Sequence, residues 1–389
     1  MKRQAYDKAI DLLRRASTGK GFLASADDVS NYKRIWARDG VICGLAALAS
    51  GDQQLIQTFR QTIATLAEHQ HRLGTIPSNV QPETGEVSYG GLAGRVDALT
   101  WFVIGVCQLA KYLDEPEIVQ QYEVHISKCL HLLETWEFNN RDLVYVPLSG
   151  NWADEYITDG YVLYDQLLRL WALRCYHHFK PSEMLKKKIQ AVEIAIQHNF
   201  LPHTAGEKVH QQAYDKLHFD AYIPASFSPA GYKNKFDALA TSLAFLLDIG
   251  DPELRSAMQL YGKKLSQGLD LKILPAFWPP VFEEDPEWHL LRDNCKFEFR
   301  NFPYEFHNGG SWTMVNGFYG LALLSQNDQD EASQILEHVN LANAKDDYAF
   351  YECFNSATGD PNGVSNCAWS ASSTVMLTRA IDHNFKLFF

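Results

Sequence analysis

The sequence of 389 residues lacks the features that mark several common classes of protein. It has no excess of positive charge, since 47 acidic against 35 basic residues give a net charge of −12. Nucleic acids and anionic membrane surfaces both need a basic binding surface, so neither is an expected partner. No apolar run approaches the ~20 residues that cross a bilayer. The seven cysteines are scattered without metal-ligand spacing, which favours reduced thiols in a cytoplasmic protein.

Several catalytic and targeting motifs are also missing. There is no Gly-x-Ser-x-Gly elbow and no His-Glu-x-x-His pair, and neither double glycine, at 90–91 or 309–310, has the spacing of a phosphate loop. Residues 1–8 carry positive charges with no apolar stretch behind them, so we expect no secretory signal. No linker rich in proline, glycine or serine divides the chain. The sequence therefore predicts one domain, 1–389, without metal or cofactor.

Helical periodicity dominates what remains. It predicts twelve helices, near 4–16, 38–50, 52–71, 95–113, 116–135, 158–179, 182–198, 234–247, 251–266, 311–325, 328–343 and 366–383. Stretches such as 98–106 are apolar nearly all round, whereas stretches such as 117–134 carry a charged face. An alternation of buried inner and amphipathic outer helices indicates an all-α fold, an (α/α)6 toroid of six helical hairpins.

Six clusters of polar and aromatic residues stand just before the apolar helices. With Asp39, Asp97, Asp154, Asp237, Trp312 and Trp369 as markers, the spacings are 58, 57, 83, 75 and 57 residues. Two helices of ~15–20 residues and two loops consume roughly that length. The hairpins should therefore bring all six clusters to one end of the barrel. The long stretches 136–157, 199–233 and 267–310 should form loops at that end, with a short strand at 143–146.

Two carboxylates in this set suit glycosidic bond cleavage, which needs an acid for the leaving oxygen and a second carboxylate for water or the anomeric carbon. Asp154 is the first candidate for the acid, because Trp152 and three tyrosines between 156 and 164 offer apolar surroundings that raise a pKa. Its neighbour Glu155 is a rival, and a carboxylate stabilising a helix start is the structural alternative. Glu352 interrupts the aromatic run 348–354; a core ion pair is its structural alternative.

The remaining cluster residues suit sugar binding. Arg38 and Asp39 open an inner helix and can either cap it or fork onto adjacent sugar hydroxyls. His307 begins a segment whose two glycines allow close backbone approach to a ligand. Each of these residues, taken alone, also has a structural explanation. The candidate sugar-contacting residues are Trp36, Arg38, Asp39, Arg95, Asp97, Trp152, Asp237, His307, Trp312 and Trp369.

Taken together, these motifs resemble the (α/α)6 glycosidases grouped around alkaline/neutral invertases, trehalases, processing α-glucosidases with mannosylglycerate hydrolases, and the glucosidase domain of debranching enzymes. The segment 36–39 resembles their Arg-Asp motif and 95–101 the invertase Val-Asp-x-x-x-Trp stretch. The segment 234–237 is similar to the later Leu-Asp motif. Phe-His-Asn-Gly-Gly-Ser-Trp at 306–312 is close to Tyr-His-Asn-Gly-Gly-Ser-Trp.

Two further segments carry the catalytic pair of that group. Residues 151–168 fit the acid-bearing segment of invertases without gaps, which places Asp154 on the general acid. Residues 352–371 resemble the Glu, Thr-Gly, Gly and Trp-Ser-Ala pattern of processing glucosidases and trehalases, which places Glu352 on the catalytic base. The resemblance implies inversion at the anomeric carbon. It departs from invertases at Glu155-Tyr156, where they carry arginines, so the resemblance does not extend to a fructose subsite.

The predicted function is an inverting, exo-acting glycoside hydrolase that releases glucose from a small α-glucoside. The candidate substrates are sucrose, trehalose, a glucosylglycerol-type solute and an α-1,6-linked disaccharide, with sucrose narrowly first by resemblance. A sugar epimerase or isomerase on the same barrel, using histidines as proton shuttles, is the alternative enzyme, and a non-catalytic sugar-binding protein is the third hypothesis. Phosphorolysis ranks lower because no basic cluster is evident near the two carboxylates. The sequence is compatible with a homo-oligomer and does not decide the oligomeric state.

Overall fold

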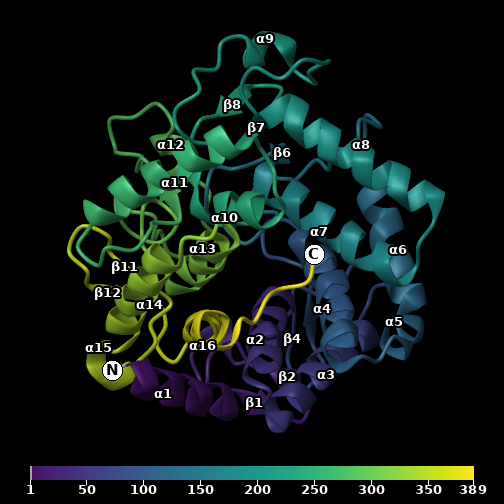
Figure 1. Cartoon of the computed structure of the whole chain (residues 1–389), viewed down its shortest axis with the longest axis vertical. Helices are drawn as coiled ribbons and strands as arrows, with labels where there is room; N and C mark the ends of the chain where they lie inside the picture. Colours follow the sequence, from purple (N-terminus) through teal and green to yellow (C-terminus); the bar gives the residue numbers. More distant parts are fainter. Residues whose placement is uncertain (1) are drawn as a thin grey trace.

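The computed structural model describes residues 2–389 with all their side chains except that of Ser30. Within this range, six helices form an inner ring and contact one another in chain order, with the last returning to the first. Figure 1 looks onto this ring, with α16 seen end-on. The inner helices are α2 (Ala37–Ser50), α4 (Asp97–Leu113), α7 (Leu163–Phe179), α10 (Ala238–Leu246), α13 (Thr313–Ser325) and α16 (Ala368–His383).

The outer layer covers the ring. Its helices are α1 (Lys2–Arg15), α3 (Gln53–Glu68), α5 (Glu117–Gln121), α6 (Glu123–Thr135), α8 (Glu183–Phe200), α11 (Pro252–Gln267) and α14 (Gln329–Asn343). The first helix, α1, packs against α16, so the two ends of the chain complete the sixth hairpin. The all-α (α/α)6 fold predicted from the sequence is confirmed. The predicted helix 116–135 is broken at Tyr122 into α5 and α6.

Burial explains the division between the two layers. The inner helices bury almost every residue, and the outer ones bury only one face. Where α13 crosses α16, a methyl group on Gly317 would lie 2.6 Å from the Cβ of Ser373, so only glycine allows this approach. No helix among the described residues is long and apolar enough to cross a membrane.

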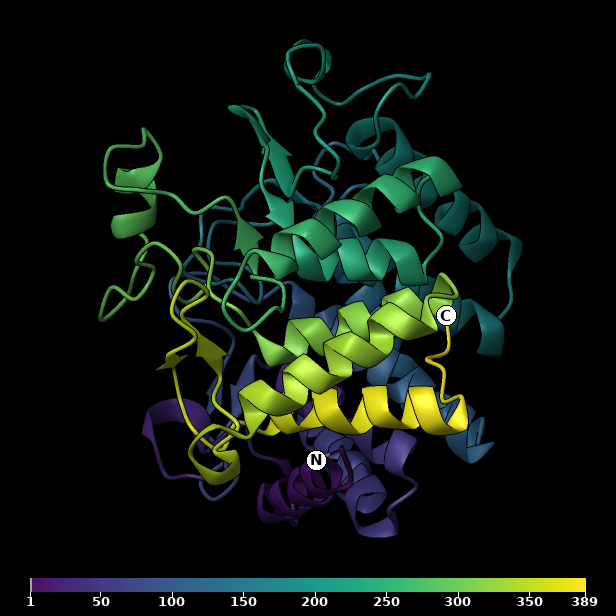
Figure 2. The ribbon, with the colours of Figure 1, turned by 60° about the vertical axis from the view of Figure 1, so that its left-hand side comes forward.

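Short antiparallel strands gather at one end of the ring, together with the long loops, as Figure 2 shows. The paired strands are β1 (Ser17–Thr18) with β2 (Gly21–Phe22), β3 (Ile35–Trp36) with β4 (Asn79–Val80) and β5 (Val87–Ser88), β6 (Tyr161–Val162) with β7 (Ser226–Ser228) and β8 (Gly231–Lys233), β9 (Phe236–Asp237) with β10 (Phe277–Trp278), and β11 (Cys353–Phe354) with β12 (Pro361–Asn362). The loops also hold η1 (Ser30–Tyr32), α9 (Gln211–Tyr214), α12 (Trp288–Arg292) and α15 (Lys345–Tyr348).

Three inner helices begin directly after such a strand, namely α2 after β3, α7 after β6 and α10 after β9. This is why α7 and α10 start five and four residues later than the helical pattern predicted, at Leu163 and Ala238. The clusters singled out in the sequence thus sit at strand-to-helix junctions. The predicted strand at 143–146 is wrong except for a single bridge between Val146 and Gly160. The amide side chain of Gln166 binds both backbone groups of Val144, which removes that residue from strand pairing.

The opposite end of the ring is closed by the last residues of the chain. The carbonyl of Phe388 accepts hydrogen bonds from Gln108 Nε2 at 2.5 Å and Trp171 Nε1 at 2.7 Å. The strand end is therefore where a ligand can enter.

Candidate active site

A cavity of about 650 Å³ opens at the strand end of the ring. That volume suits a small ligand of one or two sugar units. The residues predicted from the sequence that line it are Trp36, Arg38, Asp39, Arg95, Trp152, Asp154, His307, Trp312, Glu352 and Trp369. Asp97 and Asp237 are the two predicted contact residues that do not line it. Five of the six clusters therefore contribute side chains to the cavity, whereas the cluster around Asp237 contributes none and the carboxylate of Asp97 faces elsewhere.

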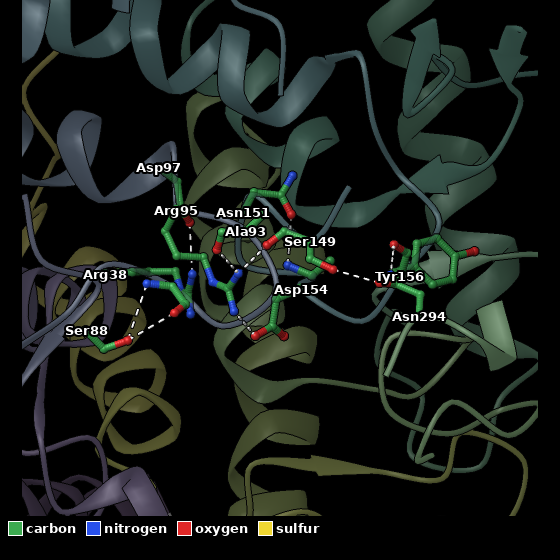
Figure 3. A network of polar contacts seen from close by, with 12 residues as sticks. Arg38, Ser88, Ala93, Arg95, Asp97, Ser149, Asn151, Asp154, Tyr156 and Asn294 are labelled. Carbon is green, nitrogen blue, oxygen red and sulfur yellow. Dashed lines mark hydrogen bonds and ion pairs between the residues drawn. The ribbon is translucent and has the colours of Figure 1, made fainter. Parts of the chain in front are cut away.

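Asp154 lies on an irregular segment between α6 and β6, with a third of its side chain exposed. Its Oδ2 forms an ion pair with Nη2 of Arg95. The same guanidinium donates hydrogen bonds to the carbonyls of Ala93 and Ser149, so it is fixed in place (Figure 3). Arg95 therefore holds the carboxylate of Asp154 at the wall of the cavity.

The apolar tyrosine wall expected around Asp154 is wrong. Tyr156 and Tyr164 are fully buried and do not line the cavity. Tyr156 stacks on Phe277 with ring centroids 4.3 Å apart. Tyr164 accepts a hydrogen bond from Trp101 and donates one to Asp97. Both rings point into the protein core because their segment turns into β6 and α7, and a guanidinium takes their place beside Asp154.

Glu155 also lines the cavity. Its Oε2 is buried and has no hydrogen-bond partner among the described residues. Burial raises the pKa of this carboxyl, and the nearby charge of Asp154 adds to the effect. Two adjacent carboxylates with different surroundings thus face the same space.

Glu352 stands directly before β11 and is almost completely buried. Its Oε1 accepts a hydrogen bond of 2.7 Å from the hydroxyl of Tyr32. Its Oε2 is buried without a partner among the described residues. Burial raises the pKa of Glu352, while the charge of Arg300 and the hydrogen bond from Tyr32 oppose the rise. Gly363 is required beside it, because a Cβ there would lie 2.4 Å from Oε2 and its φ is +77°.

The Arg-Asp pair at the start of α2 forms one side of the cavity. Nη1 of Arg38 lies 2.9 Å from Oδ2 of Asp97, and Nη2 lies 3.8 Å from Oδ2 of Asp39. Asp97 thus binds Arg38 from outside the cavity, which explains why it does not line it. Burial raises the pKa of Asp39 to about 6 despite the charge of Arg38.

Asp237 is the N-cap residue of α10. Its Oδ1 accepts a hydrogen bond of 2.9 Å from the backbone N–H of Ala240 and so caps α10. Burial raises the pKa of this carboxyl to about 7. Since β9 pairs with β10, the side chain is turned toward the helix start and away from the cavity.

Aromatic rings form another side of the cavity. The imidazole of His307 stacks on Trp312 with ring centroids 5.1 Å apart, and Trp152 meets both rings edge-on. Burial lowers the pKa of His307 well below its usual value, so the ring is neutral at physiological pH. A neutral imidazole offers one donor and one acceptor to a ligand.

Many polar atoms in this cavity are buried without a partner among the described residues. They are Nε of Arg34 and Arg38, Oδ2 of Asp39, Oδ1 of Asn79, Nε1 of Trp152 and Trp369, Oε2 of Glu155 and Glu352, and Nδ1 of His307. Buried polar groups are normally hydrogen-bonded. A ligand with several hydroxyl groups, which both donate and accept, is of the kind that satisfies such a mixed set.

Among the cavity residues that the sequence did not single out are Tyr32, Lys296 and Arg300. Lys296 and Arg300 lie in the segment 267–310, whose length was the only signal, and Tyr32 ends η1 without a signal of its own. Their presence also corrects the expectation that no basic residues stand near the two carboxylates. Arg300, Lys296 and Arg95 all line the same cavity as Asp154 and Glu352. Among the described residues, no group of three His, Cys, Asp or Glu side chains is placed to hold a metal ion.

Comparison with known proteins gives a structural likeness. No protein-family model and no curated protein matches the sequence. A GH63 mannosylglycerate hydrolase from Thermus thermophilus, solved with Tris and D-glycerate, is similar with a TM-score of 0.69 and 12% identity, over 96% of this chain and 100% of that one. The same hydrolase in complex with glucose gives a TM-score of 0.67 at 11% identity, over 96% and 99% of the two chains.

A wild-type glycosidase is also similar, with a TM-score of 0.65 and 11% identity over 97% of this chain and 96% of its own. Identity this low establishes the fold and leaves the activity to be argued from the site. The chain therefore has the (α/α)6 barrel fold of these glycosidases over nearly its whole length.

Proposed function

We propose that the protein is an inverting, exo-acting glycoside hydrolase, built as one catalytic domain, that releases glucose from a small α-glucoside. The proposal rests on the cavity, which is lined by Asp154, Glu352 and a set of buried polar atoms that have no hydrogen-bond partner among the described residues. Asp154 protonates the glycosidic oxygen. Glu352 takes a proton from the water that attacks the anomeric carbon from the opposite face. The fold shared with glycosidases supports this assignment.

Tyr32 and Arg300 suit Glu352 to act as a base. A base works in its ionised form, and burial alone disfavours that form. The hydrogen bond from Tyr32 and the charge of Arg300 both lower the pKa of Glu352 against the effect of burial. Arg38, Asp39, His307 and Trp369 supply the donors and acceptors that hold the glucose ring.

Removing the Tyr32 hydroxyl tests this role. Without its hydrogen bond the pKa of Glu352 rises further, so the ionised base is lost at a higher pH. Tyr32→Phe should therefore move the acidic limb of the kcat profile to higher pH and lower kcat about 10-fold, as loss of a hydrogen bond to a charged group costs ~1.5–3 kcal/mol. Tyr232→Phe is the matched control, because its hydroxyl binds the carbonyl of Asn199 away from the cavity. An unchanged acidic limb in Tyr32→Phe would contradict the role.

Two cations indicate the chemistry of the leaving group. Lys296 and Arg300 line the cavity, and neither forms an ion pair with another described residue. The guanidinium of Arg300 lies over the ring of Phe306, 4.0 Å from its centroid. Lys296, a cation without an ion-pair partner among the described residues, suits an anionic aglycone, while the charge of Arg300 also acts on Glu352 and Glu155. The similar mannosylglycerate hydrolase was solved with D-glycerate. We therefore place a glucoside of a small hydroxy acid such as glycerate ahead of sucrose.

A panel of glucosides tests the substrate. The panel consists of glucosylglycerate, glucosylglycerol, sucrose, trehalose and isomaltose. At low substrate concentration, the rate of glucose release should be highest with glucosylglycerate. Lys296→Met should raise the KM for glucosylglycerate about 10-fold, since a charge-assisted hydrogen bond is lost, and leave the KM for uncharged glucosylglycerol unchanged. Equal effects on both compounds would contradict the anionic subsite. Release from within a polysaccharide, or activity on mannosides alone, would contradict exo-acting glucosidase function.

One observation favours a second candidate function. His307 is neutral, lines the cavity and keeps Nδ1 free of protein partners among the described residues, as a proton shuttle of a sugar epimerase or isomerase requires. Deuterium entering unreacted sugar from the solvent would favour this function. A disaccharide that binds in calorimetry but stays intact for hours would instead indicate a sugar-binding protein.

A further inference from the structure

Two buried asparagines bracket the loop segment that carries Lys296 and Arg300. They are Asn294 and Asn301, with 5% and 0% of their surface exposed. Neither lines the cavity, so neither is placed to touch a ligand. Both side chains instead donate a hydrogen bond to the segment that bears Asp154, and both amide oxygens also accept hydrogen bonds.

The donors reach two consecutive carbonyls that follow Asp154. Nδ2 of Asn301 donates to the carbonyl of Glu155 at 2.9 Å, and Nδ2 of Asn294 donates to the carbonyl of Tyr156 at 3.0 Å. The contact between Asn294 and Tyr156 is visible in Figure 3. No other hydrogen bond among the described residues reaches either carbonyl. These two amides therefore satisfy the backbone of the acid-bearing segment.

The acceptors fix the other end of each contact. Oδ1 of Asn294 accepts from the hydroxyl of Ser149 at 2.7 Å, at the start of the acid-bearing segment. Oδ1 of Asn301 accepts from the backbone N–H groups of His307 and Asn308, at 3.0 and 3.2 Å. Asn301 thus joins the backbone beside Asp154 to the backbone of His307 on another side of the cavity. An amide side chain carries its donor and its acceptor on separate atoms, so it can bridge two backbone segments in this way.

The acid-bearing segment needs such support because residues 149–156 belong to no helix or strand. On its inner side, Nδ2 of Asn151 donates to Asp165 at 2.9 Å, and Arg95 binds the carbonyl of Ser149. On its outer side the asparagines take this role. A proton donor must lie within hydrogen-bond reach of the leaving oxygen, and a misplacement of about 1 Å costs on the order of 10²-fold in rate.

We propose that Asn301, with Asn294, is a positioning residue that sets the carboxyl of Asp154 against the leaving oxygen. The inference rests on the proposed hydrolase function. Because the same loop carries Lys296 and Arg300, the wall that contacts the aglycone and the acid that protonates it move as one unit. Recognition of the leaving group and its protonation are thereby linked through two side chains that touch neither substrate nor reacting atoms.

Leaving-group dependence distinguishes positioning from general structural support. Fluoride departs with little need for a proton, whereas an alkoxide leaving group depends on the acid. Asn301→Ala should lower kcat on the best glucoside of the panel about 10²-fold and on α-glucosyl fluoride only a few-fold, with little change in KM. Asn294→Ala should show the same selectivity with a smaller loss, and it serves if Asn301→Ala does not fold.

Asn199→Ala is the matched control. Asn199 is 3% exposed and does not line the cavity, and its amide donates to the carbonyl of Ala195 at 2.8 Å and accepts from the backbone N–H of Val209 at 2.7 Å. This variant should lose stability without changing the ratio of the two rates. If the wild type is active and Asn301→Ala keeps both rates, or loses both equally, the positioning role is contradicted. The hydrolase proposal is unaffected by that outcome. A wild type inactive on both compounds overturns the hydrolase proposal and this inference with it.

Discussion

Asp154→Asn and Glu352→Gln should each lower kcat on the best glucoside by roughly 10²–10⁴-fold, the usual contribution of positioned acid–base catalysis. Both changes keep the size of the side chain, and both residues line the cavity. Initial rates of glucose release, with circular dichroism to verify folding, give the measurement. Near-normal turnover in either variant would remove that residue from its role.

The two variants should differ on α-glucosyl fluoride. Asp154→Asn should retain much of its rate on this compound, because fluoride needs little protonation, whereas Glu352→Gln should lose both rates. Glu155→Gln is the matched control, since Glu155 lies next to Asp154, lines the same cavity and is raised in pKa by burial. If Glu155→Gln instead shows the fluoride-selective loss and Asp154→Asn does not, the acid is Glu155.

The anomer formed first tests inversion separately. An inverting enzyme releases β-glucose from an α-glucoside, because water attacks from the face opposite the leaving group. Proton NMR within the first minutes should therefore show the β-anomer before mutarotation. An initial α-anomer would require Glu352, or another carboxylate of the cavity, to act as a nucleophile.

The sequence was sufficient for the architecture because burial follows composition in this fold. Helices such as α4 and α13 bury nearly every residue, so their stretches are apolar all round, and the outer helices show one apolar face. The helix starts were less predictable. Tyr161–Val162 and Phe236–Asp237 continue the helical pattern but pair as strands with segments far along the chain. Such long-range pairing leaves no local signal.

The candidate site shows the same division. Trp152, Asp154, His307 and Glu352 were recognisable because each stands in a distinctive local cluster. The clusters did not indicate which carboxylates at helix starts face the cavity and which of them cap a helix or bind another side chain. Asp39 faces the cavity and Asp237 caps its own helix, although both stand at the start of an inner helix that follows a short strand.

Tyr32, Arg300 and the asparagine pair could not be found from the sequence for a related reason. They act across contacts between loops, such as Tyr32 with Glu352, 320 positions apart. Asn301 and Glu155 are 146 positions apart. In a toroid the catalytic groups arrive from different hairpins, so the residues that orient them come from loops that only the closed ring brings together.

The ion pair of Arg38 with Asp97 should contribute strongly to the stability of the ring. The side chain of Arg38 is 11% exposed, where it borders the cavity, and that of Asp97 is 1% exposed, so the contact between them is largely shielded from water. Removing one partner of a buried ion pair leaves an uncompensated charge and costs about 3–5 kcal/mol. Arg38→Met should therefore lower the free energy of unfolding by that amount, measured by urea unfolding at pH 8. A loss below about 1 kcal/mol would show that the pair is not held away from water.

The pH dependence of that loss and a double variant separate its causes. Arg38 restrains the pKa of Asp39, which burial raises to about 6 in the folded protein from 3.8. A carboxyl whose pKa is raised by folding stabilises the folded state at low pH and loses that contribution as the pH rises through the folded value. Without Arg38 the pKa of Asp39 rises further, so the deficit of Arg38→Met should be larger at pH 8 than at pH 5. Adding Asp97→Asn should restore most of the stability, because the buried charge left by Arg38→Met is then gone, and the remaining deficit at pH 8 reports Asp39 alone.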